Sequence, residues 1–395
     1  MYKKLIITHY QTGILIALFE NNEIVELQYE DEKEQSLLGN IYVGRVKQVV
    51  KNINAAFLSF GEAQTGYYSL TDNRNPYFLN QKKNSIPVQG DLILVQVSKE
   101  PVKTKDATLT SHINLTGKYA VLTVGNSQMS ISSKIQDENW KVSCRLICRP
   151  YCTEEYGFII RTNAYQIDLE EIIKEIKELS MQYAAIKKEA VYLTAHSLVY
   201  QSPVSYLKDL RNIYDENVAE FVTDDSNIYN QFENFLKDQP GLLKKLVLYK
   251  DPLLPLINLY SLSTVVERAL KSKVWLKSGG YLVIEPTEAL TVIDVNTGKC
   301  VIKKNVEETR QIINKEAAKE IAKQLRIRNI SGIIIVDFIN MDSEQATNEL
   351  MAYFSAELKK DPIRTYLAGI TNLGLAEVTR KKSRKSFMEQ MKPKL

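Results

Sequence analysis

The chain of 395 residues has few of the side chains on which many enzymes depend. It contains only 3 histidines and 4 cysteines, so histidine-based nucleophilic triads, Cys/His metal centres and a disulfide framework are poorly supported. No apolar run approaches the roughly 20 residues that a membrane-spanning helix needs, so no membrane partner is expected. The basic start leads into no continuous apolar segment, which indicates a chain without a secretory signal and a cytoplasmic location.

Other absences narrow the chemistry further. No G-x-x-x-x-G-K-[ST] segment is present, so the P-loop that binds nucleotide phosphates is excluded. Cys144, Cys148 and Cys152 are four residues apart, which misses the C-x-x-C spacing of structural zinc sites and favours buried small side chains. The net charge is only +4, so an anionic partner must bind local patches, such as the basic tail after Arg380.

The composition, with 44% hydrophobic and 25% charged residues, is that of a globular protein too long for a single core. Apolar alternation in the first thirty residues predicts antiparallel strands. Short glycine-punctuated strands between Gly39 and Val97 predict a small barrel, most simply of OB type. Its rings alternate with arginine and lysine, which suits stacked bases and bound phosphates, although about half of the rings should fill the core. These rings are Tyr42, Phe57, Phe60, Tyr67 and Tyr68.

The middle of the chain has a mixed pattern. A helix is expected from Asp137 to Cys148, before Pro150, and a strand from Gly157 to Ile160. Apolar spacing predicts further helices in Leu169–Glu189 and Tyr206–Leu248.

The last third predicts a strand, helix and strand that form a βαβ unit. The expected strands are Tyr281–Glu285, Ala289–Asp294 and Gly332–Asp337, and the helix is Glu307–Arg328. Continuous apolar strands are typical of a parallel sheet covered on both faces. Ligands of such sheets bind beyond the carboxyl ends of the strands, where Asp294 and Asp337 lie.

These two aspartates could share a hard divalent cation such as Mg²⁺. Asn296 would project to the same side as Asp294 if the chain stays extended, and Lys299 and Arg310 could neutralise a phosphate. The residues alone leave an alternative open, in which one aspartate caps the helix that follows its strand.

Several long motifs in one order carry a resemblance to a known family. They are Leu276–Tyr281, Glu288–Gly298, Glu316–Arg328 and Gly332–Met341, and together they resemble the catalytic region of the ribonuclease E/G family. Gly39–Val46 and Ala55–Phe57 are similar to the OB-fold RNA-binding domain of that family, and Gly157–Thr162 to its 5′-end sensor. The resemblance covers nearly the whole chain, more loosely between about residues 165 and 270.

The resemblance implies an endoribonuclease that cleaves single-stranded RNA and leaves 5′-phosphate and 3′-hydroxyl ends, in RNA processing or decay. Asp294 and Asp337 would bind Mg²⁺, or Mn²⁺, and activate water through it, with Asn296 as a third catalytic residue. By the same resemblance, Phe57, Tyr67 and Lys105 would contact the RNA. A pocket for a 5′-terminal phosphate would be formed by Gly117, Val121, Arg161, Thr162 and Arg364.

The implied fold is multidomain α+β. An RNase H-like subdomain (1–36 and 190–270) would contain an inserted OB-fold barrel (37–112) and a 5′-end sensor region (113–189). A DNase I-like α/β catalytic subdomain with a basic tail (271–395) would follow.

Three features depart from the family pattern. Asn340 stands where the family usually has aspartate, with Asp342 two positions later, and Ser133 stands beside Lys134 where some relatives have arginine. The Cys-Pro-x-Cys zinc element of the family is not found before the sequence ends at Leu395. Structural zinc is therefore not expected, and a homodimer would form without a zinc link.

Two alternatives of a different class remain open. A non-catalytic RNA-binding protein would keep the barrel and the basic tail, with the aspartates serving as caps. A metal-dependent phosphoesterase for small nucleotides would keep the carboxylates but would not need the barrel.

Overall fold

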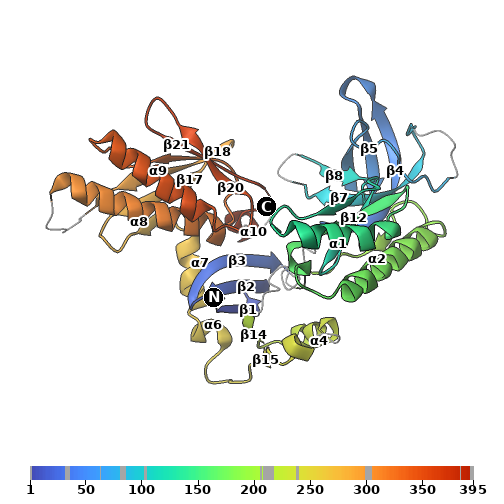
Figure 1. Cartoon of the computed structure of the whole chain (residues 1–395), viewed down its shortest axis with the longest axis horizontal. Helices are drawn as coiled ribbons and strands as arrows, with labels where there is room; N and C mark the ends of the chain where they lie inside the picture. Colours follow the sequence, from blue (N-terminus) through green and yellow to red (C-terminus); the bar gives the residue numbers. More distant parts are fainter. Residues whose placement is uncertain are drawn as a thin grey trace. The chain divides into compact units, whose positions relative to one another are not determined.

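The computed structural model describes residues 2–31, 36–62, 64–80, 86–101, 105–204, 207, 218–236, 240–298, 305–382 and 384–391. Helices and strands are mixed along the chain, which confirms the α+β class. The chain divides into two compact units, both drawn in Figure 1: a split unit of Met1–Gln35 with Asn217–Leu395, and an inserted unit of Ser36–Glu216. Within the described ranges, no helix is long and apolar enough to cross a lipid bilayer.

The inserted unit contains the predicted OB-like barrel. Its strands are β4 (Ile41–Val50), β5 (Ala55–Phe60), β6 (Gln64–Ser69), β7 (Leu92–Lys99) and β8 (Ala107–Thr110). They pair in the order β4-β5-β6-β8-β7, and β7 pairs back to β4, so the sheet closes on itself. A third neighbour of β4 is β13 (Leu198–Tyr200). A Cβ on Gly66 would lie 2.6 Å from the Leu109 side chain, so glycine allows β6 and β8 to close the barrel.

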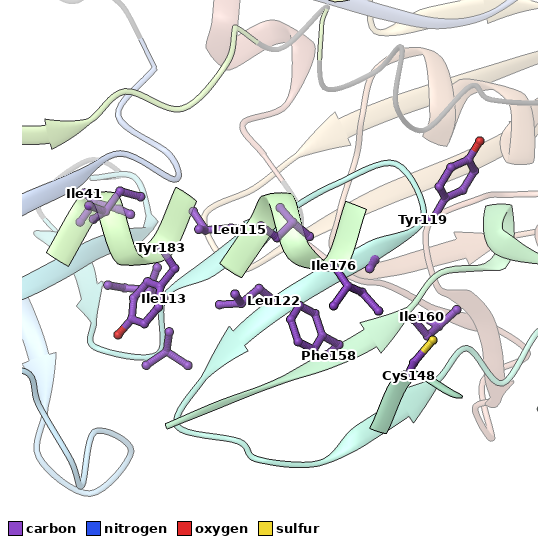
Figure 2. Close-up of a cluster of buried hydrophobic side chains, with 14 of the residues drawn as sticks. Ile41, Ile113, Leu115, Tyr119, Leu122, Cys148, Phe158, Ile160, Ile176 and Tyr183 are labelled. Carbon is purple, nitrogen blue, oxygen red and sulfur yellow. The ribbon is translucent and has the colours of Figure 1, made fainter. Parts of the chain in front are cut away.

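A four-stranded sheet, which we call the small sheet, completes the inserted unit. It has the order β11 (Met129–Ile131), β12 (Tyr156–Ile160), β10 (Ala120–Val124) and β9 (Asn114–Thr116). Helix α2 (Leu169–Ala190) covers it, and Leu122, Phe158 and Ile176 belong to the core shown in Figure 2. Helix α1 (Glu138–Cys148) begins after Asp137, which accepts a hydrogen bond from the Trp140 N–H as its N-cap. Both the α1 and α2 predictions are confirmed.

The cysteines of the inserted unit are free thiols. Cys144 and Cys148 are completely buried in the core beside α2, and Cys152 is half-buried. The interpretation as small buried side chains therefore holds.

The split unit begins with a five-stranded sheet of order β15-β14-β1-β2-β3. Its strands are β1 (Lys3–Tyr10), β2 (Gly13–Glu20), β3 (Glu23–Asp31), β14 (Val218–Thr223) and β15 (Leu246–Leu248). The first three are antiparallel, as predicted, and the turn between β2 and β3 has positive φ at Asn21 and Asn22. β14 and β15 run parallel to β1.

These two strands correct the helical prediction for Tyr206–Leu248. Among the described residues of that segment, α4 (Ser226–Phe235), α5 (Pro240–Leu243) and the single residue Leu207 are helical. The strands form there because β14 pairs with β1 and β15 pairs with β14, which satisfies their backbone groups, and apolar spacing does not reveal those partners. The short helices α6 (Leu256–Leu259) and α7 (Leu262–Leu270) follow.

The C-terminal sheet of the split unit has the order β16-β17-β18-β19-β21-β20. Its strands are β16 (Lys273–Trp275), β17 (Tyr281–Pro286), β18 (Leu290–Asn296), β19 (Gly332–Asp337), β20 (Thr365–Ile370) and β21 (Ala376–Arg380). Between them lie α8 (Val306–Ile327) and α9 (Glu344–Leu358), and α10 (Phe387–Met391) ends the described chain. The predicted strand, helix and strand are therefore present.

The expectation of a sheet covered on both faces is wrong. Only β18 and β19 are parallel, and the other neighbours in this sheet are antiparallel. Ile293 and Ile334 are fully buried in one core with residues of α8 and α9, whereas Val292 is 37% and Ile333 52% exposed on the opposite face. We call this opposite side the open face. Alternating burial is typical of a sheet with helices on one side.

Candidate functional site

Asp294 and Asp337 lie side by side on the open face. β18 and β19 pair without a bulge, and Asp294 is directly opposite Asp337. Both aspartates are exposed. Asn296 projects to the same face, two residues farther along β18, and its Nδ2 donates a hydrogen bond of 2.6 Å to Asp294 Oδ2. The structure thus brings together the three residues selected as catalytic.

Neither aspartate is a helix cap. The N-cap of α8 is Asn305, whose side chain accepts a hydrogen bond from the Glu308 N–H. The N-cap of α9 is Ser343. The capping alternative therefore does not explain why aspartate ends both strands.

Two glycine-containing turns approach each other at the end of β18. Gly298 has a φ of 57°, and a Cβ there would lie 2.3 Å from the carbonyl oxygen of Gly279. A Cβ on Gly280 would lie 2.9 Å from the carbonyl oxygen of Asn296. Glycine therefore lets the turn before β17 pack against the chain that carries Asn296.

Two residues of α8 hold the backbone near the carboxylates and were not selected from the sequence. Asn314 is fully buried, donates to the Ile339 carbonyl at 2.7 Å and accepts from the Ile339 N–H at 3.0 Å. It thereby fixes the segment that follows Asp337. Glu316 accepts two backbone N–H groups of the turn before β17, at 2.6 and 3.1 Å. A polar residue among the apolar positions of the predicted helix was the available signal for Asn314.

Arg310, a sequence candidate for phosphate binding, is engaged by carboxylates. Its Nη1 lies 3.2 Å from Asp342 Oδ1 and 3.7 Å from Glu307 Oε2. The arginine therefore links the start of α8 to the segment after β19. The other candidate, Lys299, lies outside the described residues.

The oxygen donors on the open face fit a hard divalent cation. Among the residues that the structure describes, no group of three or more His, Cys, Asp or Glu could hold a metal ion. A pair of carboxylates nevertheless suits Mg²⁺, which usually keeps several waters and takes further oxygens from a phosphate substrate. The exposure of Asp294 and Asp337 leaves room for such ligands.

The barrel separates its aromatic residues into two groups. Tyr42, Phe60 and Tyr68 are buried in the barrel core, and burial raises the pKa of the Tyr68 phenol. Phe57 and Tyr67 are directly opposite each other on β5 and β6 and half-buried, with their ring centroids 6.2 Å apart. Two of the five rings are therefore available at the barrel surface.

Basic and polar groups accompany these two rings. Lys47 donates from Nζ to Thr65 Oγ1 at 3.3 Å. Lys105 is exposed just before β8, the strand that pairs with β6. Phe57 and Tyr67 therefore lie in neighbouring strands of one sheet, and Lys105 precedes a third strand of that sheet.

Four of the five predicted 5′-phosphate residues lie at one end of the small sheet. Arg161 follows β12, and its Nη1 donates to the Gly117 carbonyl at 2.8 Å. Val121 is in β10, the strand between β9 and β12. Thr162 is exposed, and its Oγ1 lies 2.9 Å from Ser132 Oγ. The fifth residue, Arg364, belongs to the split unit, where it precedes β20.

Glu175 of α2 organises the loop between β9 and β10 and was not selected from the sequence. Its carboxylate accepts the backbone N–H groups of Tyr119 and Ala120 at 2.6 and 2.8 Å, and also that of Lys118. A Cβ on Gly117 would lie 2.6 Å from this carboxyl group, so a larger residue at that position would displace the Glu175 carboxylate.

Known proteins resemble this chain over most of its length. Residues 114–383 match the Ribonuclease E/G family. Ribonuclease G of Haemophilus influenzae is 34% identical over 383 residues, which cover 94% of this chain and 78% of that protein. Ribonuclease G of Escherichia coli strain K12 is 32% identical with the same coverage. Ribonuclease E of a Nostoc species is 34% identical over 95% of this chain and 55% of its own length. The extent of these matches shows that the chain belongs to the ribonuclease E/G family.

Proposed function

We propose that this chain is an endoribonuclease that cleaves single-stranded RNA with a divalent metal ion and acts in RNA processing or decay. The observation that carries the proposal is the pairing of Asp294 directly opposite Asp337, with Asn296 hydrogen-bonded to Asp294. Membership of a ribonuclease family supports hydrolysis of RNA. The products would carry 5′-phosphate and 3′-hydroxyl ends.

In this proposal Asp294 and Asp337 would hold Mg²⁺, or Mn²⁺, through their carboxylate oxygens. The ion would stabilise charge at the scissile phosphate and lower the pKa of water, so no histidine or protein nucleophile is needed. Asn296 orients the Asp294 carboxylate before the substrate arrives, since its amide already donates to Oδ2. Asn314 acts one step farther away by fixing the chain after Asp337.

The inserted unit would bind the RNA. Phe57 and Tyr67 offer rings on which bases can stack, and Lys105 offers a cation for the backbone. Arg161 and Thr162 would bind a 5′-terminal phosphate, because a guanidinium and a hydroxyl are strong donors to phosphate oxygens. Gly117 and Val121 would line that pocket.

The subdomain names belong to the proposal as well. The strand order β3-β2-β1-β14-β15, with three antiparallel strands followed by two parallel ones, supports an RNase H-like subdomain. The closed barrel supports the OB-fold assignment, and the small sheet is assigned as the 5′-end sensor. The sheet that carries Asp294 is assigned as the DNase I-like subdomain. A homodimer without a zinc link and a cytoplasmic location remain predictions.

Cleavage of a short single-stranded RNA, with Mg²⁺ and with excess chelator, tests the proposal. We expect cleavage only with the metal ion, and mass spectrometry should find a 5′-phosphate on the downstream product. RNA that is bound but uncut in both conditions would support the non-catalytic alternative. Hydrolysis of small nucleotides without cleavage of RNA would support a phosphoesterase.

A further inference from the structure

A cluster of one cation and two rings lies on the same open face as the carboxylates. The Lys273 Nζ is 4.2 Å from the centroid of the Trp275 ring and 3.6 Å from that of the Tyr281 ring. The two ring centroids are 5.3 Å apart, with the planes at 60°. We call these three residues the β16 cluster.

Strand register places the β16 cluster next to the candidate metal site. Trp275 is opposite Tyr281, and Tyr281 is opposite Asn296. Lys273 is opposite Val283, which is in turn opposite Asp294. Opposite residues share a face of the sheet, so the cluster and the carboxylates lie on one side. Neighbouring strands are about 4.8 Å apart, and only β17 lies between β16 and β18, so these two strands are about 10 Å apart.

Folding alone does not account for this cluster. Val274, between the two outward residues, packs against the core of the C-terminal sheet and already attaches β16. Trp275 keeps 62% of its surface exposed. Within the described part of the chain, no carboxylate forms an ion pair with Lys273. An exposed ring next to an uncompensated ammonium group matches the chemistry of a nucleotide, which offers an aromatic base and a phosphate.

We infer that the β16 cluster binds the nucleotide next to the scissile phosphate. The base stacks on Trp275, and the Lys273 ammonium pairs with the phosphate of the same nucleotide. Tyr281 supports the Trp275 ring from the side and adjoins Asn296. The inference rests on the proposed ribonuclease function, and it makes these residues positioning groups for the substrate.

Substitutions test the stacking with a matched control. Trp275→Ala should lower kcat/KM for single-stranded RNA by about 5- to 150-fold, the range of one lost base–ring stack. Trp275→Phe should restore most of the rate. Tyr192→Ala, which removes an 80% exposed ring from the inserted unit, should match wild type. If the wild type cleaves RNA and Trp275→Ala cleaves it equally well, the inference is wrong but the proposed function stands. If the wild type does not cleave RNA, the proposed function is rejected.

Substrates with a single abasic site identify the nucleotide. In wild type, removal of one base beside the cleavage site should slow the reaction, and Trp275→Ala should show no further loss with that substrate. If Trp275→Ala slows cleavage equally for every abasic substrate, whichever base is missing, the assigned contact is wrong.

Fluorescence tests the same contact without cleavage. The chain has 2 tryptophans, so Asp294→Asn with Trp140→Phe leaves Trp275 as the only reporter in a variant that should not cut. We expect single-stranded RNA to quench its emission and an abasic sugar–phosphate strand of equal length to leave it unchanged. Saturable RNA binding with no quenching would place the strand elsewhere and overturn the inference.

Discussion

Asp294 and Asp337 lie opposite each other on two parallel strands of one sheet, although 42 residues lie between them in the sequence. The long helix α8 makes this possible, because it returns the chain along the covered face and starts β19 beside β18. The carboxylates face away from α8, on the side that stays exposed.

Asp294→Asn or Asp337→Asn should abolish cleavage and leave RNA binding nearly unchanged. The loss of charge stabilisation by the bound metal should lower the single-turnover rate by on the order of 1,000-fold or more. Glu349→Gln removes an exposed carboxylate from α9 and serves as the control. If both variants stay folded and keep more than about a tenth of the wild-type rate, the metal assignment is wrong.

Asn314→Ala should lower the rate of cleavage more than the affinity for RNA. The change leaves the Ile339 N–H and carbonyl without their partner, which should cost about 1–3 kcal/mol of unfolding free energy. It also loosens the chain after Asp337. Urea unfolding and single-turnover rates measure both effects, and Gln345→Ala on the exposed side of α9 is the control. An unchanged rate in a folded variant would remove Asn314 from the site.

RNA with a 5′-monophosphate should be cleaved faster than the same RNA with a 5′-hydroxyl. Arg161→Ala should erase most of that ratio, because one charged hydrogen bond is worth about 1.5–3 kcal/mol, or roughly 10- to 150-fold. Thr162→Val should reduce it less. Arg145→Ala removes an exposed arginine of α1 and should leave the ratio unchanged. Equal wild-type rates on the two substrates would reject the pocket.

The buried ion pair of Arg380 and Asp361 should be important for stability. The Arg380 Nε lies 2.7 Å from Asp361 Oδ2, and the two side chains are only 3% and 4% exposed. Asp361→Ala should lower the unfolding free energy by about 3–5 kcal/mol, because a buried guanidinium is left unpaired. Glu23→Gln breaks the exposed pair with Lys323 and should cost no more than about 1 kcal/mol. Urea unfolding compares the two, and equal losses would contradict the argument.

Asp225, the N-cap of α4, should stabilise the split unit more when it is ionised than when it is protonated. Partial burial acts to raise the pKa of Asp225, but hydrogen bonds from His9 and from the Ile228 and Asn227 N–H groups leave it below its ordinary value. The negative charge at this helix end is worth about 0.3–1 kcal/mol. Because the folded pKa is the lower one, this stabilisation is complete above the ordinary value of about 3.9 and is lost as the pH falls through the folded value.

Asp225→Asn keeps a capping oxygen and removes the charge. The stability difference between wild type and this variant should therefore be largest near pH 5 and shrink toward about pH 3, as measured by urea unfolding. A difference that does not change with pH would show that the charge has no part in it.

The sequence by itself determined local structure and the positions of the main chemical groups. The βαβ unit is defined by the strand before Asn296, the periodic helix that follows it and the apolar run before Asp337. These were predictable because local periodicity shows which side of a segment is apolar. The closed barrel followed from its glycine-punctuated strands. The resemblance to a known family added roles for residues such as Arg161 that periodicity alone does not supply.

Only the tertiary structure decided which faces are covered and which residues meet. The antiparallel neighbours β17 and β21 and the one-sided packing of α8 and α9 leave Asp294 exposed, although its strand is apolar enough for a buried sheet. Phe57 faces outward and Phe60 inward because barrel closure assigns the two sides. Asn314 and Glu175 act on backbone groups far away in sequence, so their role depends on contacts that no local pattern specifies. Burial and pairing are set by such distant partners, and this is why the sequence predicted the elements better than their surroundings.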